Sequence, residues 1–250
     1  MSIVWDGTDL ATYGFTLMGD GSEESGLLSL PGMRRQITEM PGRAWPEVVD
    51  LGRDPRDIRL SCALIATTHA TLLSYRASFL ALVSSSDFVS LTVPDITARR
   101  LMVHTDGEIA MPRPELAWDT LYLRFTWDLK SLHSFWEDAS LVSVTPVGAE
   151  LTNDGHEPCP VTWTCTVTAD LPTGLWFEVG GVRFTYSGAL VTNDVLVVST
   201  DLPAVTLNGV VDMANTHVDA EFPWLAVDTN DITKSSASFT LGADYRRWYR

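Results

Sequence analysis

The sequence runs Leu121-Tyr122-Leu123-Arg124-Phe125-Thr126-Trp127-Asp128-Leu129 near the middle of the chain, and every second one of these residues is apolar. A period of two places Leu121, Leu123, Phe125, Trp127 and Leu129 on one face of a β-strand. The run 58–65 alternates in the same way, and further strand-like runs lie at 88–93, 99–104, 161–168, 175–179, 182–186 and 195–199. The sequence therefore predicts a mainly β protein.

Two dipeptides predict tight turns between strands. Gly180-Gly181 separates the runs 175–179 and 182–186, and glycine accepts the positive φ that two-residue hairpin turns require. Asn208-Gly209 stands in the same way between Val205-Thr206-Leu207 and Val210-Val211. Both pairs predict β-hairpins in the second half of the chain.

One segment has a helical period instead. Between residues 68 and 83 the apolar residues recur at intervals of three and four: Leu72, Leu73, Tyr75, Phe79, Leu80, Leu82 and Val83. Thr67 or Thr68 can cap the amino end, and Ser84-Ser85-Ser86 ends the pattern. A single helix at about 68–83 among a dozen or more strands predicts two tandem β-sandwich or barrel domains.

The boundary between these domains is expected near residues 131–150. The long strand that ends at Leu129 gives way there to a polar and aromatic segment, and a new series of short strands begins near Leu141. We therefore predict a first domain of residues 1–138, which contains the helix, and a second domain of residues 139–250, which lacks helical periodicity.

The charge balance excludes several classes of partner. Against 17 Lys and Arg stand 32 Asp and Glu, which gives a formal net charge of −15. Such a surface repels phosphate backbones and anionic lipids, so we expect no sequence-specific nucleic-acid binding. No run approaches the roughly 20 apolar residues of a membrane span, and the first residues resemble no secretory signal. We expect no membrane insertion.

Motifs that carry chemistry are missing from the sequence. It contains no phosphate-binding GxxxxGK[ST], no GxSxG, no HExxH and no CxxC. Cys159 and Cys165 are expected as small core residues rather than metal ligands. The acidic loops around Asp20 and Asp228 lack the closing glutamate of a calcium loop. We expect neither an enzyme nor a bound cofactor or metal.

The order of the features resembles the distal tail proteins of long-tailed, non-contractile bacteriophages over essentially the whole chain. The features are Val4-Trp5-Asp6-Gly7, Tyr13-Gly14-Phe15, Arg35 to Arg43 with its Pro41-Gly42-Arg43 turn, Asp50-Leu51-Gly52, the strand 58–65, the helix, Asn153-Asp154-Gly155, Phe184 to Gly188, Phe222-Pro223-Trp224-Leu225, Asn230 and Tyr245 to Trp248. The second half resembles the galectin-like domain of that family.

The resemblance implies a structural subunit of the virion tail tip, assembled in the host cytoplasm. Such a subunit would form a homo-oligomeric ring, expected to be a hexamer, that joins the tail tube protein to the tail-tip hub protein. The ring would leave a channel for DNA, and the galectin-like domain would carry peripheral receptor-binding proteins. A tail-derived particle, such as a gene transfer agent, stays open as an alternative to a phage.

Two sets of site residues follow from this hypothesis. A large aromatic side chain in an otherwise polar extended segment is expected to dock on a neighbouring subunit. The candidate ring interface therefore comprises Met40, Pro41, Gly42, Arg43 and Trp45. Acidic side chains on turns would line the channel and repel DNA, and the candidates are Asp20, Glu23, Glu24, Asp95 and Asp106.

A carbohydrate-binding module is the second hypothesis, because galectin-like sandwiches hold sugars and the chain has nine tryptophans. Trp163 and Trp176 are the candidate stacking residues, although the sequence shows no His, Asn or Arg set beside them. A ring former would run as an oligomer in light scattering, whereas a lectin would bind a glycan array.

Overall fold

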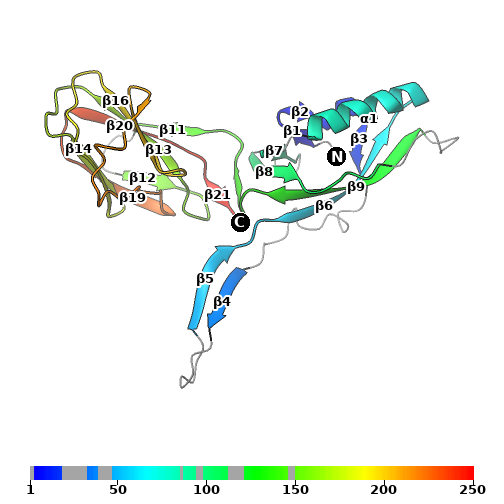
Figure 1. Ribbon diagram of the computed structural model, residues 1–250, viewed down its shortest axis with the longest axis horizontal. Coiled ribbons are helices and arrows are strands. Elements are labelled where there is room, and N and C mark those ends of the chain that lie inside the picture. The colour runs from blue at the N-terminus through cyan, green and yellow to red at the C-terminus, as the bar shows by residue number, and fades with distance from the viewer. Residues whose placement is uncertain are drawn as a thin grey trace. The chain divides into compact units, whose positions relative to one another are not determined.

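The chain forms two compact units, Met1–Trp136 and Glu137–Arg250, in a computed structural model (Figure 1). The structure describes residues 3–18, 33–38, 47–84, 87–93, 98–111, 121–145 and 150–250. The division between the units lies two residues before the predicted boundary. Strand β10 (Trp136–Asp138) spans this division.

The first unit is built on one antiparallel sheet with the order β2-β1-β7-β8-β9-β6-β3. Its strands are β1 (Val4–Trp5), β2 (Thr8–Asp9), β3 (Phe15–Leu17), β6 (Asp57–Ile65), β7 (Val89–Thr92), β8 (Arg99–Thr105) and β9 (Tyr122–Ser131). A 3-10 helix, η1 (Leu10–Tyr13), joins β2 to β3. Strands β4 (Met33–Thr38) and β5 (Glu47–Arg53) form a separate two-stranded sheet.

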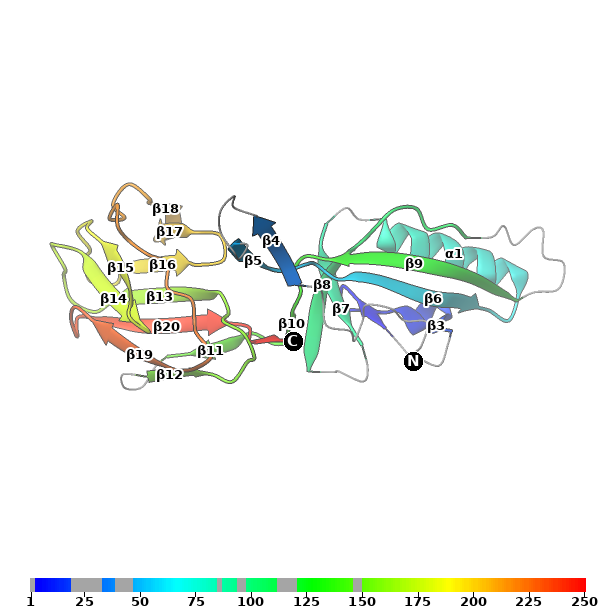
Figure 2. The same cartoon turned by 90° about the horizontal axis from the view of Figure 1, so that it is seen from below.

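Helix α1 (His69–Val83) confirms the predicted helix and runs along β6 and β9 in both views (Figures 1 and 2). Its N-cap is Thr68, whose Oγ1 accepts a hydrogen bond from the backbone N–H of Thr71 at 3.1 Å. Phe79 projects from the helix into an aromatic cluster. Its ring centroid lies 5.6 Å from that of Phe15 and 5.3 Å from those of Phe125 and Trp127. This cluster fixes the helix on one face of the sheet.

The period of two in β6 and β9 divides the sheet into a buried and an outer face. Leu123, Phe125, Trp127 and Leu129 are all buried, as predicted. Leu121 is the exception: it precedes the first residue of β9 and is 44% exposed, so it does not share the burial of the other four residues. The alternation holds only where the backbone is extended, and Leu121 lies just outside that stretch.

The second unit is a sandwich of two sheets, as predicted. One sheet has the order β11-β20-β13-β16-β17-β18 and the other β12-β19-β14-β15. Their strands are β11 (Val142–Val144), β12 (Glu150–Asn153), β13 (Val161–Val167), β14 (Leu175–Val179), β15 (Val182–Tyr186), β16 (Val195–Ser199), β17 (Ala204–Leu207), β18 (Val210–Val211), β19 (Asp228–Lys234) and β20 (Phe239–Tyr245); β21 (Trp248–Tyr249) follows near the end.

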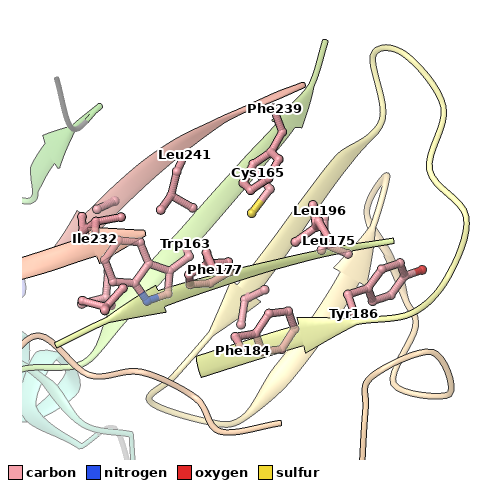
Figure 3. Close-up of a cluster of buried hydrophobic side chains, with 14 of the residues drawn as sticks. Trp163, Cys165, Leu175, Phe177, Phe184, Tyr186, Leu196, Ile232, Phe239 and Leu241 are labelled. Carbon is pink, nitrogen blue, oxygen red and sulfur yellow. The ribbon is translucent and has the colours of Figure 1, made fainter. Parts of the chain in front are cut away.

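The core of this sandwich lies between the inner faces of its two sheets (Figure 3). Trp163, Phe177 and Phe184 are fully buried there. The ring centroid of Phe177 lies 5.6 Å from that of Trp163 and 5.3 Å from that of Phe184. Cys159 and Cys165 are buried free thiols, as is Cys62 in the first unit. Burial raises the pKa of both Cys159 and Cys165 to about 12. These cysteines pack as small apolar residues.

Both predicted hairpin turns are present in the second unit. Gly180 and Gly181 have φ angles of 57° and 86°, and Asn208 and Gly209 have φ angles of 51° and 81°. Two successive positive φ values give a turn whose twist matches that of the strands it joins. No helix within the described residues is long and apolar enough to cross a membrane.

Candidate interface surfaces

The hairpin of β4 and β5 is the first candidate surface. Met33 pairs with Arg53 and Thr38 pairs with Glu47, with a register shift between Met33 and Arg35. Among the described strands, neither β4 nor β5 pairs with any other strand. A two-stranded sheet alone is marginally stable in water, because it buries little apolar surface. Within the described residues, the hairpin therefore has two open edges that a partner could use.

The outer face of β6 and β9 carries a charged end. Asp57 pairs with Lys130 and Arg59 pairs with Asp128 across the two strands. The Arg59 Nε lies 2.7 Å from the Asp128 Oδ1, and the Lys130 Nζ lies 3.8 Å from the Asp57 Oδ1. Asp106 borders the same shallow hollow, of about 350 Å³. The charges here are mixed, with three carboxylates against two cations.

The other end of the same face is apolar. Ile65 and Tyr122 are cross-strand partners, and they are 50% and 46% exposed. Together with Met18, Ala63 and Leu121 they line a groove of about 380 Å³, with Arg124 at its side. We call these five residues the apolar patch. Exposed patches of this kind mark interaction surfaces, because a monomer gains nothing from leaving them in water.

Trp176 lies on the outer face of the second unit with two charged neighbours. The guanidinium of Arg183 stacks over the Trp176 ring, 4.0 Å from its centroid, and its Nη2 lies 3.0 Å from the Glu178 Oε2. One arginine and one glutamate thus accompany Trp176, where the sequence had shown no His, Asn or Arg set beside the candidate tryptophans. Trp163, by contrast, is fully buried, and its indole N–H donates to the carbonyl of Pro223 at 2.9 Å. Trp163 therefore cannot stack on a sugar.

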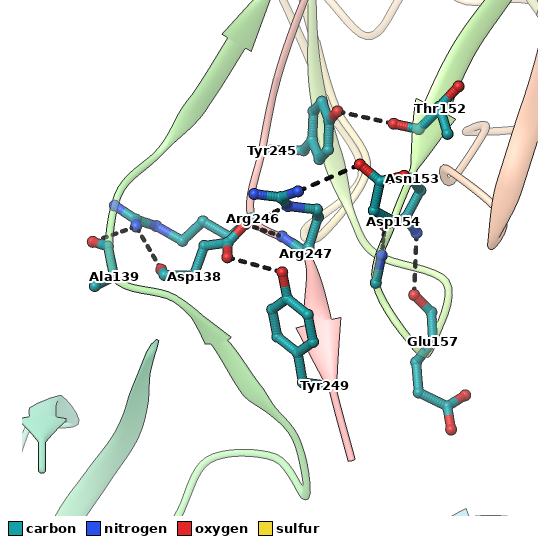
Figure 4. A network of polar contacts seen from close by, with 11 residues as sticks. Asp138, Ala139, Thr152, Asn153, Asp154, Glu157, Tyr245, Arg246, Arg247 and Tyr249 are labelled. Carbon is teal, nitrogen blue, oxygen red and sulfur yellow. Dashed lines mark hydrogen bonds and ion pairs between the residues drawn. The ribbon is translucent and has the colours of Figure 1, made fainter. Parts of the chain in front are cut away.

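A polar network ties the last strands of the second unit to its first residues (Figure 4). The Asp138 carboxylate accepts from the Arg247 Nε at 2.7 Å and from the Tyr249 hydroxyl at 3.0 Å. The Arg246 guanidinium donates to the carbonyls of Asp138 and Ala139 at 2.8 and 2.7 Å. The hydrogen bond from Arg247 to Asp138 raises the pKa of that arginine. The network anchors the carboxyl-terminal end of the chain.

Two comparisons with known proteins bear on this architecture. Residues 154–249 match the family model for the C-terminal domain of siphovirus-type tail components. Among solved structures, the Dit protein of phage SPP1 matches with a TM-score of 0.79 at 12% sequence identity, and the match covers 100% of this chain and 99% of that chain. The chain has the siphovirus distal tail protein fold. No curated protein sequence matches the chain.

The resemblance to distal tail proteins that the sequence indicated is thereby confirmed, and so is the predicted mainly β fold with one helix. Both matches are to structural components of phage tails. The family model and the similar structure are both described as tail components, which agrees with the expectation of a structural protein of the virion tail. SPP1 Dit itself is described as a paradigm of the hub of the adsorption apparatus in phages that infect Gram-positive bacteria.

The predicted interface residues of this distal tail protein fold lie mostly outside the described residues. Met40, Pro41, Gly42, Arg43 and Trp45 belong to the connection between β4 and β5, at 39–46, and Asp20, Glu23, Glu24 and Asp95 also lie outside. Asp106 is described: it is exposed, and its backbone N–H donates to the carbonyl of Asp128 at 2.9 Å. Both sets of residues stay predictions.

The apolar patch was missed at the sequence level, although a signal for it existed. In the alternation of β6 the core positions are even-numbered, so Ile65 falls on the outer face. An isoleucine at a solvent-facing strand position is a cue for an interface.

Proposed function

We propose that this chain is the subunit of a closed ring, with six copies, at the distal end of a siphovirus tail. The first unit would close the ring and join the tail tube protein to the tail-tip hub, around a channel for DNA. The second unit would carry peripheral receptor-binding proteins. The observation that carries the proposal is the agreement of the fold with SPP1 Dit over the whole chain.

Two features of the first unit support ring closure. The open edges of the β4–β5 hairpin need strand partners, and a neighbouring copy can supply them. The apolar patch contains the exposed side chains of Ile65 in β6 and Tyr122 in β9, which a neighbouring copy could cover. Heterologous contacts between unlike surfaces of one subunit close into rings when the rotation between copies fits.

Light scattering and negative-stain images of the purified protein test this proposal. Six chains of 27.5 kDa give a particle of about 165 kDa. Trp45→Ala is expected to lower the oligomeric mass, and so is Ile65→Asp. Leu132→Asp is the matched control, because Leu132 is 52% exposed on the same unit and lies outside the apolar patch. A monomer at high concentration, with and without tail tube protein, would contradict the ring.

The acidic candidates are proposed to line the channel. The first domain carries 12 basic and 19 acidic residues, a net charge of −7, and like charges let DNA pass without adhesion. Asp106 borders the same hollow as Asp57 and Asp128, and these three carboxylates exceed the two cations Arg59 and Lys130 by one charge, which supports a weakly acidic character at that end. A structure of the assembled ring tests the proposal. A neutral or basic inner face would refute it and leave the ring intact.

Carbohydrate binding is the second candidate function, and Trp176 with Arg183 and Glu178 favours it. An aromatic ring beside a charged donor and an acceptor is a common arrangement for sugar recognition. Because Arg183 covers one face of the Trp176 ring, a sugar would have to displace it or use the other face. Saturable binding on a glycan array, lost in Trp176→Ala, would support this function; an array without signal would exclude it.

A further inference from the structure

Strand β18 is one of the two edge strands of the six-stranded sheet in the second unit. This strand pairs with β17 on one side and, within the described part of the chain, with no strand on the other. The Asp212 N–H donates to the Val205 carbonyl at 2.9 Å, so in an antiparallel pair the N–H and C=O of the preceding residue, Val211, point away from β17. These outward groups can accept another strand.

The side chains at this edge are apolar and exposed. Val210 and Val211 are 69% and 70% exposed, and successive residues of a strand point to opposite faces, so neither face of β18 is covered. Leu202, between β16 and β17, is 78% exposed, and Met213, just after β18, is 42% exposed. Natural proteins protect such edges with short strands, lysine or proline; β18 is short, with two residues, but has neither lysine nor proline.

The stretch of sequence that contains β18 is acidic. No lysine or arginine occurs between Arg183 and Lys234, whereas seven acidic residues do. Asp201 and Asp212 flank the exposed side chains in sequence, and the Asp194 carboxylate accepts from the Asn208 side chain in the β17–β18 turn at 2.8 Å. The pKa of Asp212 is lowered by the hydrogen bond from the Tyr186 hydroxyl, and that of Asp194 by the hydrogen bond from Asn208. Both carboxylates therefore stay charged well below neutral pH.

We propose that β18 is a docking edge for an extended segment of another protein, one that alternates basic and aliphatic side chains. Such a segment would add a seventh strand beside β18, with its aliphatic side chains on Val210 or Val211 and its cations near Asp201 and Asp212. A second copy of this chain fits poorly, because two acidic edges repel each other. The inference rests on the proposed function to this extent: it names the chemistry by which the second unit would hold a peripheral protein.

A labelled peptide of three Lys-Val repeats tests the proposal on the full chain by fluorescence anisotropy. The control peptide has the same sequence with every backbone amide N-methylated, so it keeps the charge and loses its backbone donors. We expect the control to bind about tenfold more weakly or worse, which is a loss of about 1.4 kcal/mol. Hydrogen exchange should show slower exchange of the Val211 amide with the unmodified peptide.

Val211→Lys gives the matched substitution, with Leu141→Lys as its control. Leu141 is 51% exposed and immediately precedes β11, the opposite edge of the same sheet. We expect about tenfold weaker peptide binding for Val211→Lys and little change for Leu141→Lys. Equal binding of the two peptides, or equal effects of the two substitutions, would reduce the interaction to charge attraction and overturn the proposal.

Light scattering of the same samples separates this inference from the ring. A chain that stays monomeric with and without tail tube protein, and that binds the peptide through β18, would contradict the ring and keep the docking edge. A hexamer without edge-specific binding would keep the ring and overturn the docking edge.

Discussion

Replacing Asp138 by alanine is expected to destabilise the second unit by about 2–3 kcal/mol. The carboxylate accepts hydrogen bonds from Arg247 and from the Tyr249 hydroxyl, and both Asp138 and Tyr249 are buried. A hydrogen bond to a charged group contributes about 1.5–3 kcal/mol, and a neutral donor left without an acceptor costs about 1 kcal/mol or more. The Arg247 side chain is 30% exposed, so water can solvate the guanidinium when the carboxylate is removed. The lower end of the range for a charged hydrogen bond therefore applies to this contact.

Urea denaturation of the full chain, followed by tryptophan fluorescence, measures this effect. Asp138→Asn keeps an acceptor and loses the charge, so it should cost about 1 kcal/mol. Asp154→Asn is the control: Asp154 is 71% exposed and lies 3.5 Å from the Arg247 Nη1, so its removal should cost less than about 0.5 kcal/mol. If Asp138→Ala and Asp154→Asn shifted the midpoint equally, the anchoring role of Asp138 would be refuted.

Three further measurements address the second unit. Gly174→Ala should lower the free energy of unfolding by about 2–4 kcal/mol, because Gly174 has a φ of 75° and an added Cβ would lie 2.0 Å from the Tyr186 carbonyl oxygen; a stability within error of the wild type would contradict this. The pKa of Asp212 is lowered from 3.8, chiefly by the hydrogen bond from the Tyr186 hydroxyl. The ionised carboxylate therefore stabilises the folded state above pH 3.8, and this contribution is lost as the pH falls through the lowered pKa. Asp212→Asn should flatten the acid limb of a plot of stability against pH. A chain of residues 139–250 should be soluble and melt cooperatively, and limited proteolysis of the full chain should cut first near 131–150; early cuts inside 155–245 would show that the halves are one fold.

The strands and the helix could be predicted because their determinants are local. The alternation in 58–65 and 121–129 places apolar side chains on one face whatever the partner strand, and Thr68 caps the helix through its own neighbouring amide. The two hairpin turns follow from residues that accept positive φ. The resemblance to a family supplied the order in which these elements assemble.

The surfaces could be predicted only in part, because they depend on register between strands. The two-residue turn at Gly180-Gly181 sets Glu178 opposite Arg183, and this pairing was available from the sequence. The stacking of Arg183 on Trp176 depends on the rotamers of both side chains, which no spacing reveals. Likewise, the acid-rich stretch 184–233 is visible in the sequence, but its meeting with an open sheet edge at β18 is a property of the topology.

The three natural cysteines are buried, so they should react little with thiol-directed labels. The thiolate is the form that reacts with maleimides and oxidants, and burial raises the pKa of the Cys159 and Cys165 thiols to about 12, so both are protonated at neutral pH. Cys62 is also shielded from solvent. A single cysteine introduced at an exposed position such as Leu202 or Leu132 would therefore carry a fluorophore or spin label selectively, without removal of the natural cysteines. With labels at both positions, the spacing between the two units of one chain becomes measurable in solution, and one label per chain would report the spacing between copies in the proposed ring.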